Sequence, residues 1–384
     1  MKKIVILTVL LIIALTAISC TKTENISQEP LTLSWDEIVE NGKNSTVNLY
    51  YWGGSTAINN YFDEFVSDNL KKKYNITLNT VPVSDIKDIV NKILLEKQNN
   101  QTDGSVDLLW INGENFKLMK DENLLYGDLT SVLPNFNKYI KENPLDFTEA
   151  TNGLEVPFGK AQFVLVYNEE RVTEEIKTLG DLTQWIKNNP GRFTYPSIPD
   201  FTGSAFIRHF YYHESNGIES LKDINPYLWR QGETYPNSSG TLDTLYSQGE
   251  VDFTMSYTPF HQIQKIRSGE FSEASKTLIL EDGTLSNTHF LTIPFNSEEK
   301  AGALIAINYL ISFEAQYEKM KPSIWGDLMV LKEEYLSETE RNLIKTLIVD
   351  YQLDIETFEN NRLEEFSGDK IEAIEKEWIE KILE

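Results

Sequence analysis

Short β-prone segments alternate with amphipathic helical segments along this chain from Thr46 onward. Residues 47–52 are strand-like, and residues 53–56 make a turn with a helix N-cap. Apolar side chains then recur at helical spacing from Ile58 to Leu70. Repeated units of this kind predict an α/β fold, in which each sheet is mostly parallel and is flanked by helices.

Two further strand-like segments follow the first unit. Residues 76–81 lead into an amphipathic helix over 85–96, and residues 106–111 end in the polar loop 112–115. In open α/β sheets, ligands bind beyond the carboxyl ends of the strands. The loops at 53–56 and 112–115 are therefore expected to lie at a binding site.

The same arrangement occurs again in the second half of the chain. Residues 193–196 are strand-like, a helix opens at 201–204, and a strand over 251–255 ends in the loop 256–259. Residues 156–168 form one long strand-like segment that can cross from one lobe to the other, and residues 290–294 can return. We therefore expect two α/β lobes, joined by hinge strands, with a cleft between them.

The expected boundaries follow from these crossings. The domain assignment is a lipoprotein signal peptide over 1–20, a tether over 21–44, a first lobe over 45–160 plus 288–325, and a second lobe over 161–287 plus 326–384.

The N-terminal segment has the pattern of a lipoprotein signal. Lys2 and Lys3 precede an apolar run that ends at Ile18, and Ser19 leads to Cys20. Cys20 is therefore the expected lipidation site, although Ala17 stands where leucine is commoner. An uncleaved anchor is the alternative, but the apolar run is short for a hydrocarbon core about 30 Å thick. These features predict export and a lipid anchor at the outer face of the cell membrane or in the periplasm.

Composition excludes several classes of chemistry and partner. Cys20 is the only cysteine, so no other thiol can serve as a nucleophile, a disulfide partner or a metal ligand. The formal net charge is -24, and a body this acidic repels nucleic acid and anionic lipid headgroups. We therefore expect no nucleic-acid partner.

Several segments resemble the extracellular solute-binding proteins of ABC importers. The resemblance is carried by VPFGKAQFVLVYNEERV at the crossover, LGDLTQWIKNNPGRFTYP with DFTGSAFI, and AGALIAINYLISFEAQ. The segments YYWGGSTAINNYFDEFV and DLLWINGENF are most similar to the YnjB-like subfamily. The resemblance implies a two-lobe, type II periplasmic-binding-protein-like fold that closes around a small solute, with no catalysis and no cofactor. The implied partners are an ABC permease and its ATPase, and the implied state is a monomer.

Two helix starts are candidates for solute binding. Gly54, Ser55 and Thr56 in one lobe, and Thr202, Gly203 and Ser204 in the other, offer amides and hydroxyls that suit an anionic group. An ordinary turn with a helix N-cap is the alternative for each.

Aromatic and polar residues beside these loops complete the predicted site. The aromatic side chains suit an apolar or cationic solute or else pack in the core, and Glu114 either pairs with an amine or is a solvated loop acid. The additional candidates are Trp52, Trp110, Asn112, Glu114, Phe158, Gln162 and Tyr257.

No motif indicates catalysis or a metal site. A nucleophile elbow, a phosphate-binding glycine loop and an HExxH pattern are missing from the sequence. His209 and His213 have a spacing compatible with a metal, but the aromatic residues around them favour a partly buried helix face.

Two alternatives to import stay open. A sensory lipoprotein would use the same fold to signal to a membrane receptor. A secreted hydrolase would place Glu114, or another acid with a raised pKa, beside a second carboxylate.

Overall fold

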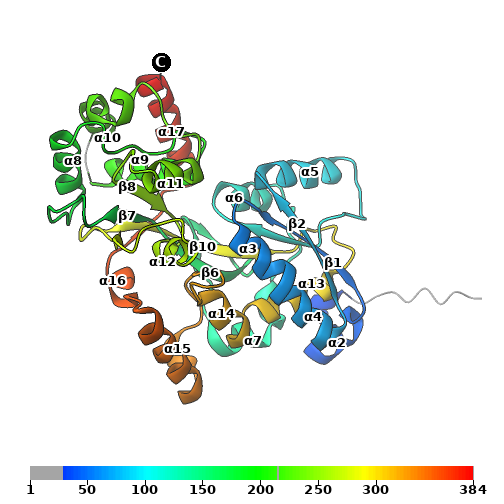
Figure 1. Ribbon diagram of the computed structural model, residues 1–384. Helices are drawn as coiled ribbons and strands as arrows, with labels where there is room; N and C mark the ends of the chain where they lie inside the picture. The colour runs from blue at the N-terminus through cyan, green and yellow to red at the C-terminus, as the bar shows by residue number, and fades with distance from the viewer. Residues whose placement is uncertain (1–28, 214–215, 384) are drawn as a thin grey trace, which may run out of the picture.

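A computed structural model describes residues 29–213 and 216–383 of this chain. Two lobes lie side by side, and the chain passes between them more than once (Figure 1). Lobe 1 is built on a six-stranded sheet and lobe 2 on a three-stranded sheet. Each lobe has its own large apolar cluster, so the predicted two-lobe α/β architecture is confirmed.

The sheet of lobe 1 is mixed. Its strand order is β11-β10-β3-β1-β2, and β6 pairs with β10. β1 runs parallel to β2 and β3, whereas β10 runs antiparallel to β3 and β6. The strands are β1 (Thr46–Trp52), β2 (Thr77–Val83), β3 (Leu108–Ile111), β6 (Val156–Gln162), β10 (Thr284–Thr292) and β11 (Arg362–Glu364).

Helices cover both faces of this sheet, because successive strand side chains point to opposite faces. In β3, Leu108 and Trp110 join the larger apolar cluster, while Leu109 and Ile111 join a second cluster under α5 and α6. The helices of lobe 1 are α2 (Trp35–Gly42), α3 (Thr56–Asn60), which continues through a π-helical turn (Tyr61–Val66) into α4 (Ser67–Tyr74), α5 (Ile86–Gln98), α6 (Glu114–Asp121), α7 (Pro134–Tyr139), α13 (Lys300–Leu310) and α14 (Phe313–Met320).

The expected tether is partly folded. Within residues 21–44, α2 begins at a capping box formed by Ser34 and Glu37. Ile38 has no exposed surface and packs in the core of lobe 1. Cys20 and the rest of the predicted leader lie outside the described residues.

The sheet of lobe 2 is antiparallel, which differs from the expected parallel arrangement. β7 is the central strand and pairs antiparallel with both β8 and β9. β7 continues the crossover from β6, so it enters lobe 2 in the direction opposite to β8 and β9. The alternation of strand-like and helical segments in the sequence does not reveal this direction. The elements are β7 (Val164–Asn168), β8 (Phe253–Ser256), β9 (Ser275–Leu278), α8 (Leu179–Asn188), α9 (Phe201–His213), α10 (Gly217–Ile224), α11 (Ser239–Ser247) and α12 (His261–Arg267).

The predicted strand over 193–196 does not form. Phe193 and Tyr195 are completely buried, and the Asp252 amide donates to the Arg192 carbonyl at 2.8 Å. No ladder continues beyond that bond, so the segment is a buried, extended connection rather than a strand.

The crossover consists of two strands instead of one. Phe163 separates β6 from β7, and its amide donates to the Leu285 carbonyl at 2.8 Å. The predicted return over 290–294 lies largely within β10, which pairs with β6 from Ser286 onward. The paired strands β6 and β10 connect the two lobes.

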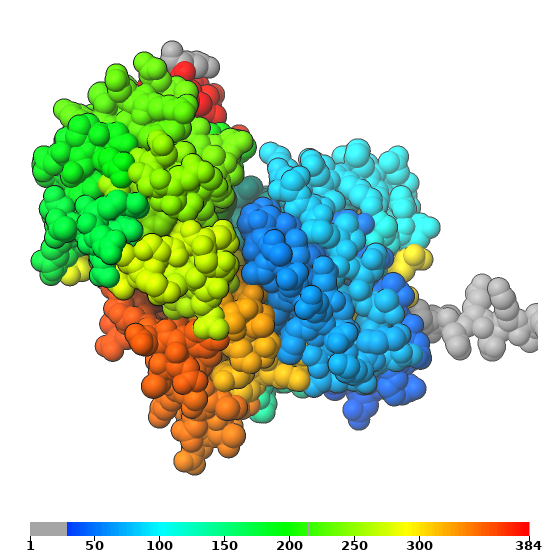
Figure 2. Space-filling view, viewed as in Figure 1, coloured from blue at the N-terminus to red at the C-terminus, as the bar shows by residue number. Residues whose placement is uncertain are grey.

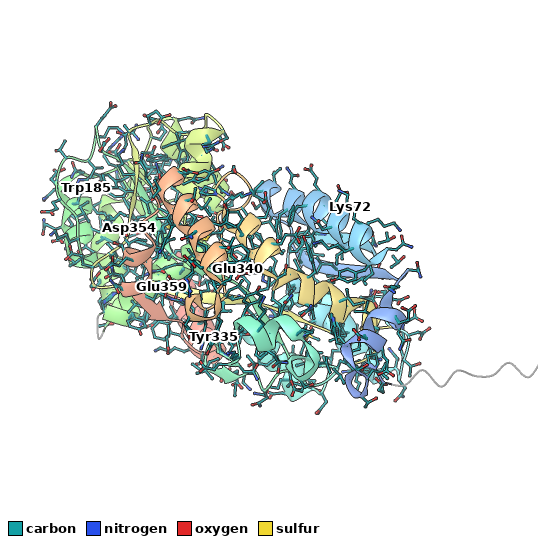
Figure 3. The ribbon with its side chains drawn as sticks, turned by 90° about the horizontal axis from the view of Figure 1, so that it is seen from below. Lys72, Trp185, Tyr335, Glu340, Asp354 and Glu359 are labelled. Carbon is teal, nitrogen blue, oxygen red and sulfur yellow. The ribbon has the colours of Figure 1, made fainter. Side chains whose placement is uncertain are left out.

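The C-terminal segment spans the junction of the lobes. Seen from below in Figure 3, Glu340, Asp354 and Glu359 lie between Lys72 of lobe 1 and Trp185 of lobe 2. A separate apolar cluster joins Val164 and Phe260 to Leu347 and Phe358. The elements are α15 (Glu338–Tyr351), α16 (Ile355–Asn360) and α17 (Gly368–Trp378), and α17 packs on the core of lobe 2. The exact lobe boundaries stay a prediction.

Candidate functional site

The two lobes face each other across a notch in the molecular surface (Figure 2). At one point they touch, because a Cβ built on Gly368 of α17 would lie 2.9 Å from the Cβ of Glu114 on α6. The loops that follow β1 and β3 are on the lobe 1 side. These elements define the candidate site.

The loop after β1 is held by backbone contacts. The Gly53 amide donates to the Val83 carbonyl at 2.9 Å, and the Asn59 side chain donates to the Gly53 carbonyl at 3.2 Å. Trp52 is 44% exposed, and its ring lies so close to Gly54 that a Cβ there would be 2.1 Å from a ring carbon. Gly54 therefore allows an exposed indole to lie over this loop.

Ser55 stands at the N-cap position of α3, but its side chain does not cap the helix. Its backbone is extended, with φ −131°, and α3 begins on the side of lobe 1 that faces lobe 2 (Figure 1). Thr56 is the first residue of α3 and is exposed. Within the described part of the chain, the Ser55 hydroxyl is not used for helix capping and remains available to a solute.

The second predicted helix start is already capped from within the protein. The Asp200 carboxylate accepts hydrogen bonds from the amides of Gly203 and Ser239, each at 2.9 Å. Thr202, Gly203 and Ser204 form the buried first turn of α9. An acidic side chain thus occupies the position that the sequence suggested for an anionic solute.

Ser204 and Tyr257 meet in a buried polar cluster that the sequence did not reveal. Arg208 donates to Glu365 through Nε at 3.1 Å and Nη2 at 2.7 Å, and it also donates to the Ser204 hydroxyl. The hydroxyls of Tyr257 and Ser204 donate to Glu365 and Glu375, respectively. Arg208 follows Ser204 by one helical turn, but Glu365 is 157 positions away and no local pattern pairs them.

The exposed rim of this cluster is aromatic. The Phe201 ring lies 5.0 Å from the Tyr257 ring and 5.3 Å from the Arg208 guanidinium, measured to ring centroids. Phe201 is 44% exposed. We call this surface the wall of lobe 2: it is aromatic, and the ion pair of Arg208 and Glu365 lies behind it.

Glu114 projects from lobe 1 toward this wall. It is the first residue of α6, after Gly113, whose φ of 61° favours glycine. Burial by surrounding protein atoms raises the pKa of Glu114; the negative charge of Glu375 raises it further, and the positive charge of Arg208 opposes this. The pKa of Glu114 therefore depends on charged residues of lobe 2.

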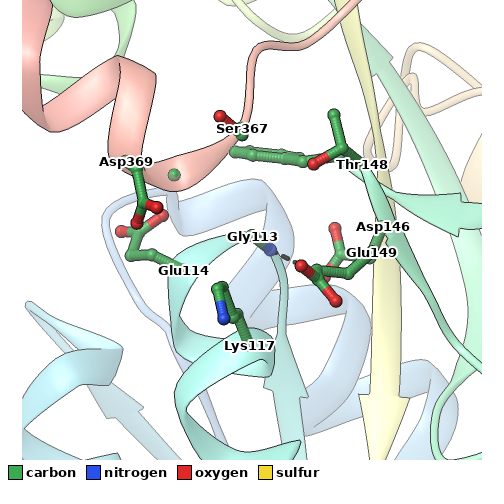
Figure 4. A pocket seen from close by; sticks show the side chains of 10 residues that line it. Gly113, Glu114, Lys117, Asp146, Thr148, Glu149, Ser367 and Asp369 are labelled. Atoms are coloured by element: carbon green, nitrogen blue, oxygen red, sulfur yellow. Dashed lines mark hydrogen bonds between the residues drawn. The ribbon is translucent and has the colours of Figure 1, made fainter. Parts of the chain in front are cut away.

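A pocket of about 70 Å³ lies between the starts of α6 and α17 and the turn between β4 (Leu145–Asp146) and β5 (Glu149–Ala150) (Figure 4). We call it the interlobe pocket. It is lined by Gly113, Glu114, Lys117, Asp146, Phe147, Thr148, Glu149, Ser367, Gly368 and Asp369.

Asp146 lies at the base of the interlobe pocket and is almost completely buried. Its Oδ2 accepts from the Gly113 amide at 2.6 Å, while its Oδ1 has no hydrogen-bond partner in the described chain. Burial raises the pKa of Asp146 to about 8, and the nearby charges of Glu114 and Glu149 act in the same direction. This carboxyl is therefore mostly protonated at neutral pH.

Two of the predicted aromatic residues belong to the core. Phe158 has no exposed surface and Trp110 is 7% exposed; their ring centroids are 5.3 Å apart. Gln162 is buried and donates to the Thr284 hydroxyl at 2.9 Å. In this structure, these three side chains hold lobe 1 and the hinge together. Asn112 is half-buried at the end of β3.

A second buried ion pair lies beside the hinge strands. Lys319 donates to Asp327 and to the Phe158 carbonyl, each at 2.6 Å, and His289 lies 3.3 Å from Asp327. Burial lowers the pKa of Lys319, which the charge of Asp327 counteracts. These contacts attach α14 to β6 and β10.

His209 is bound on both ring nitrogens. Nδ1 contacts the Ala205 carbonyl at 2.7 Å, and Nε2 accepts from the Leu285 amide at 3.0 Å. Burial lowers the pKa of His209 to about 3. The ring is therefore a neutral structural group that joins α9 to β10. Among residues 29–213 and 216–383, no group of three acidic, histidine or cysteine side chains is arranged to hold a metal ion.

None of the described helices combines the length and apolar character needed to cross a membrane.

Comparison with known proteins gives concordant matches. A family model described as bacterial extracellular solute-binding protein matches residues 66–342. Protein YnjB of Escherichia coli (strain K12) is 34% identical over 370 residues, which cover 90% of this chain and 93% of that protein.

Solved structures share the fold at low sequence identity. An ABC transporter protein from Clostridium perfringens has a TM-score of 0.61 at 16% identity, covering 88% of this chain and 98% of that chain. The apo ferric ion-binding protein A of Pasteurella haemolytica has a TM-score of 0.62 at 16% identity, covering 87% of this chain and 97% of that chain. The expected type II periplasmic-binding-protein fold is therefore confirmed.

Proposed function

Because this chain belongs to the bacterial extracellular solute-binding protein family, we propose that it is the substrate-binding protein of an ABC importer. It captures a small solute between its lobes and delivers the solute to a membrane permease, which works with an ATPase. The protein acts as a monomer and carries out no reaction of its own.

The observation that carries this proposal is the position of the interlobe pocket. Residues of α6 and of the β4–β5 turn form one wall, and Ser367, Gly368 and Asp369 at the start of α17 form the other. A solute held there contacts both lobes at once. Because such a solute gains contacts only when the lobes are together, it stabilises the closed form in proportion to its preference for that form.

The paired strands β6 and β10 are suited to act as the hinge. They connect the lobes, and the register of their pairing shifts between His289 and Phe290. Each lobe has its own large apolar core, so their relative rotation leaves both cores intact. The rotation is taken up at the smaller apolar cluster that joins Val164 and Phe260 to Leu347 and Phe358 at the junction.

Trp52, Ser55 and Thr56 are proposed to contact the solute from lobe 1, together with Asn112 and Glu114. In lobe 2 the proposed contacts are Tyr257 and the first turn of α9, with Thr202, Gly203 and Ser204, although Asp200 caps that turn and Ser204 is buried in this structure. The exposed indole of Trp52 and the uncommitted Ser55 hydroxyl support the lobe 1 assignment.

The solute we propose is not a metal ion, although one structural relative is named a ferric ion-binding protein. The described part of this chain has no cluster of three acidic, histidine or cysteine side chains at metal-binding spacing. The proposed solute is an organic molecule.

Membrane attachment through lipid on Cys20 is part of the proposal. The basic and apolar leader that ends at Ser19 supports it. Intact-mass measurement of the membrane fraction tests it, because acyl chains on Cys20 add a defined mass.

A secreted hydrolase is a second candidate, because one of its expected features is present. Glu114 and Asp146 both have raised pKa values and line one pocket. Burial is the main cause of both shifts, however, and Asp146 already binds the Gly113 amide. Hydrolysis of chromogenic glycosides that is lost in Glu114→Gln would support this candidate over import.

Native mass spectrometry of the full chain in mild detergent tests the main proposal. We expect one small molecule per chain, released by mild denaturation. An empty protein that also shows no thermal stabilisation by any solute class would contradict solute binding.

A further inference from the structure

We infer that the interlobe pocket binds the positively charged amine or guanidinium end of the solute. The inference rests on the proposed function and deepens it, because it assigns the solute a charge class. Three features of the pocket carry it: unpaired carboxylates, a buried unpartnered oxygen and an aromatic ring.

The carboxylates come from both lobes. Glu114 and Asp369 line the pocket, and neither forms an ion pair with another residue of the described chain. The other charged lining groups are already neutralised outside the pocket, because Lys117 pairs with Asp121 at 2.6 Å and Glu149 pairs with Lys120 at 3.2 Å. Two unpaired acids therefore face each other across the lobe junction.

Asp146 places a buried carboxyl oxygen without a partner below these two acids. Its side chain is almost completely buried, it lines the pocket, and its Oδ1 has no hydrogen-bond partner in residues 29–213 and 216–383. A buried polar oxygen without a partner costs free energy, which a donor on the solute would recover once the carboxyl releases its proton. An ammonium or guanidinium group carries only donors and fits this need.

Phe147 adds an aromatic surface to the same pocket. Its φ is 51°, an uncommon value for a residue with a side chain, and its ring lies against Gly113. A cation within about 6 Å of an aromatic ring face is attracted by the ring electrons. Acids and an aromatic ring around one small space are the combination that recognises organic cations.

The alternative is an anionic solute, because α6 and α17 both begin at this pocket. A helix N-terminus carries a partial charge of about +0.5, so two of them supply about +1. The carboxylates of Glu114 and Asp369 together exceed that charge, and the positive charge of Lys117 is already paired with Asp121. Ionisation of Asp146 when a cation binds adds a further negative charge. The electrostatic balance therefore favours a cation.

The pocket volume sets the size of the recognised group. About 70 Å³ accommodates a charged head group but not a whole metabolite. The remainder of the solute would extend past Glu114 toward the aromatic rings of Phe201 and Tyr257, which lie 5.0 Å apart and suit an apolar chain or ring.

Isothermal titration calorimetry of the full chain with 1,4-diaminobutane tests the inference, with 1,4-butanediol and succinate as neutral and anionic probes. We expect the diamine to bind and the other two probes to fail. The double variant Glu114→Gln, Asp369→Asn should weaken diamine binding by about tenfold or more, the effect of losing a charge-assisted hydrogen bond. Glu372→Gln, which removes an exposed acid from the same helix, should leave binding unchanged.

Proton release gives an independent readout. A bound cation favours the ionised form of Asp146, which faces Glu114, Glu149, Glu155, Lys117, Lys120 and Asp369. Binding should therefore release a proton near neutral pH, seen as a binding enthalpy that differs between phosphate and Tris buffers. Asp146→Asn should remove this difference.

Succinate binding without diamine binding would overturn the inference. So would a diamine affinity of the double variant that equals the affinity of the unaltered protein. If no probe binds but native mass spectrometry reveals a neutral or anionic solute, the charge class is wrong and the proposed function stands. If no probe binds and no solute is found, both fail.

Discussion

Arg208 and Glu365 lie 157 positions apart in the sequence and form a bidentate ion pair that is shielded from solvent, with Nε–Oε2 and Nη2–Oε1 distances of 3.1 and 2.7 Å. The pair fixes α9 to the chain just after β11, and it places Ser204 and Tyr257 on the wall of lobe 2. Removing one partner would leave the other charge buried.

We therefore expect Glu365→Gln to lower the free energy of unfolding by about 3–5 kcal/mol, as broken buried ion pairs do. Urea denaturation followed by circular dichroism measures this. Asp121→Asn, which breaks the exposed pair with Lys117, should cost less than about 1 kcal/mol. The double variant Arg208→Met, Glu365→Leu should recover stability relative to Glu365→Gln. Equal losses of unfolding free energy in Glu365→Gln and Asp121→Asn would contradict the assignment of a buried ion pair.

Asp146 should make stability depend on pH. Its pKa is about 8 in the folded protein and near 3.8 without the surrounding structure, so the folded state holds this proton more tightly. The resulting stabilisation is complete below about pH 4 and is lost as the pH rises toward 8, by up to about 1.4 kcal/mol per pH unit.

Asp146→Asn should remove that contribution. We expect the free energy of unfolding of the unaltered protein to fall between pH 5 and pH 8 relative to that of the variant, measured by urea denaturation. Glu114, Glu149, Glu155 and Lys120 face the same region and remain present in both proteins. Parallel pH profiles would show that Asp146 titrates normally.

Trp52 should report closure of the lobes. It is 44% exposed in the loop after β1, whereas Trp110, Trp185, Trp325 and Trp378 are buried. Binding of the co-purified solute should bury the indole and shift its fluorescence to shorter wavelength. Trp52→Phe should lose most of this response while keeping the solute; a full response in that variant would place Trp52 outside the moving region.

Ser55 and Ser204 should act together on closure, but for different reasons. Ser55 has a hydroxyl that caps no helix, whereas the Ser204 hydroxyl joins Arg208 to Glu375. We expect Ser55→Ala to weaken solute binding without changing stability. Ser204→Ala should also lower the free energy of unfolding by about 1–3 kcal/mol, since it leaves buried polar groups unpaired.

The double variant Ser55→Ala, Ser204→Ala should show no solute-induced decrease in the radius of gyration by small-angle X-ray scattering. Closure that persists with unchanged affinity would remove both residues from the proposed site.

Local pattern accounts for most of lobe 1. The predicted strand over 47–52 and helix over 85–96 correspond closely to β1 and α5, because alternating and helical periodicities each reflect burial against one face. Strand direction in lobe 2 was not predictable in the same way. It depends on how β7 leaves β6, which is set by the pairing of Phe163 with Leu285 more than a hundred residues away.

The candidate site was only partly accessible from sequence. The loops at Ser55 and Glu114 were identified because they follow strands. Phe158 and Trp110 have the same local setting, yet they pack against each other and against Trp325. The buried carboxyl of Asp146 and the ring of Phe147 depend on a short hairpin turn and on α17 from the far end of the chain, so no local signal indicates them.

The repeated crossing of the chain between lobes also has a consequence for biosynthesis. The core of lobe 1 contains residues from Ile38 to Leu336, and that of lobe 2 is completed by Trp378, which has no exposed surface. A nascent chain thus lacks parts of both cores until synthesis is nearly finished. Domains whose core residues are synthesised early fold on the ribosome, whereas each lobe of this protein waits for residues that are synthesised late. For an exported protein, this late closure favours a polypeptide that is still unfolded when translocation begins.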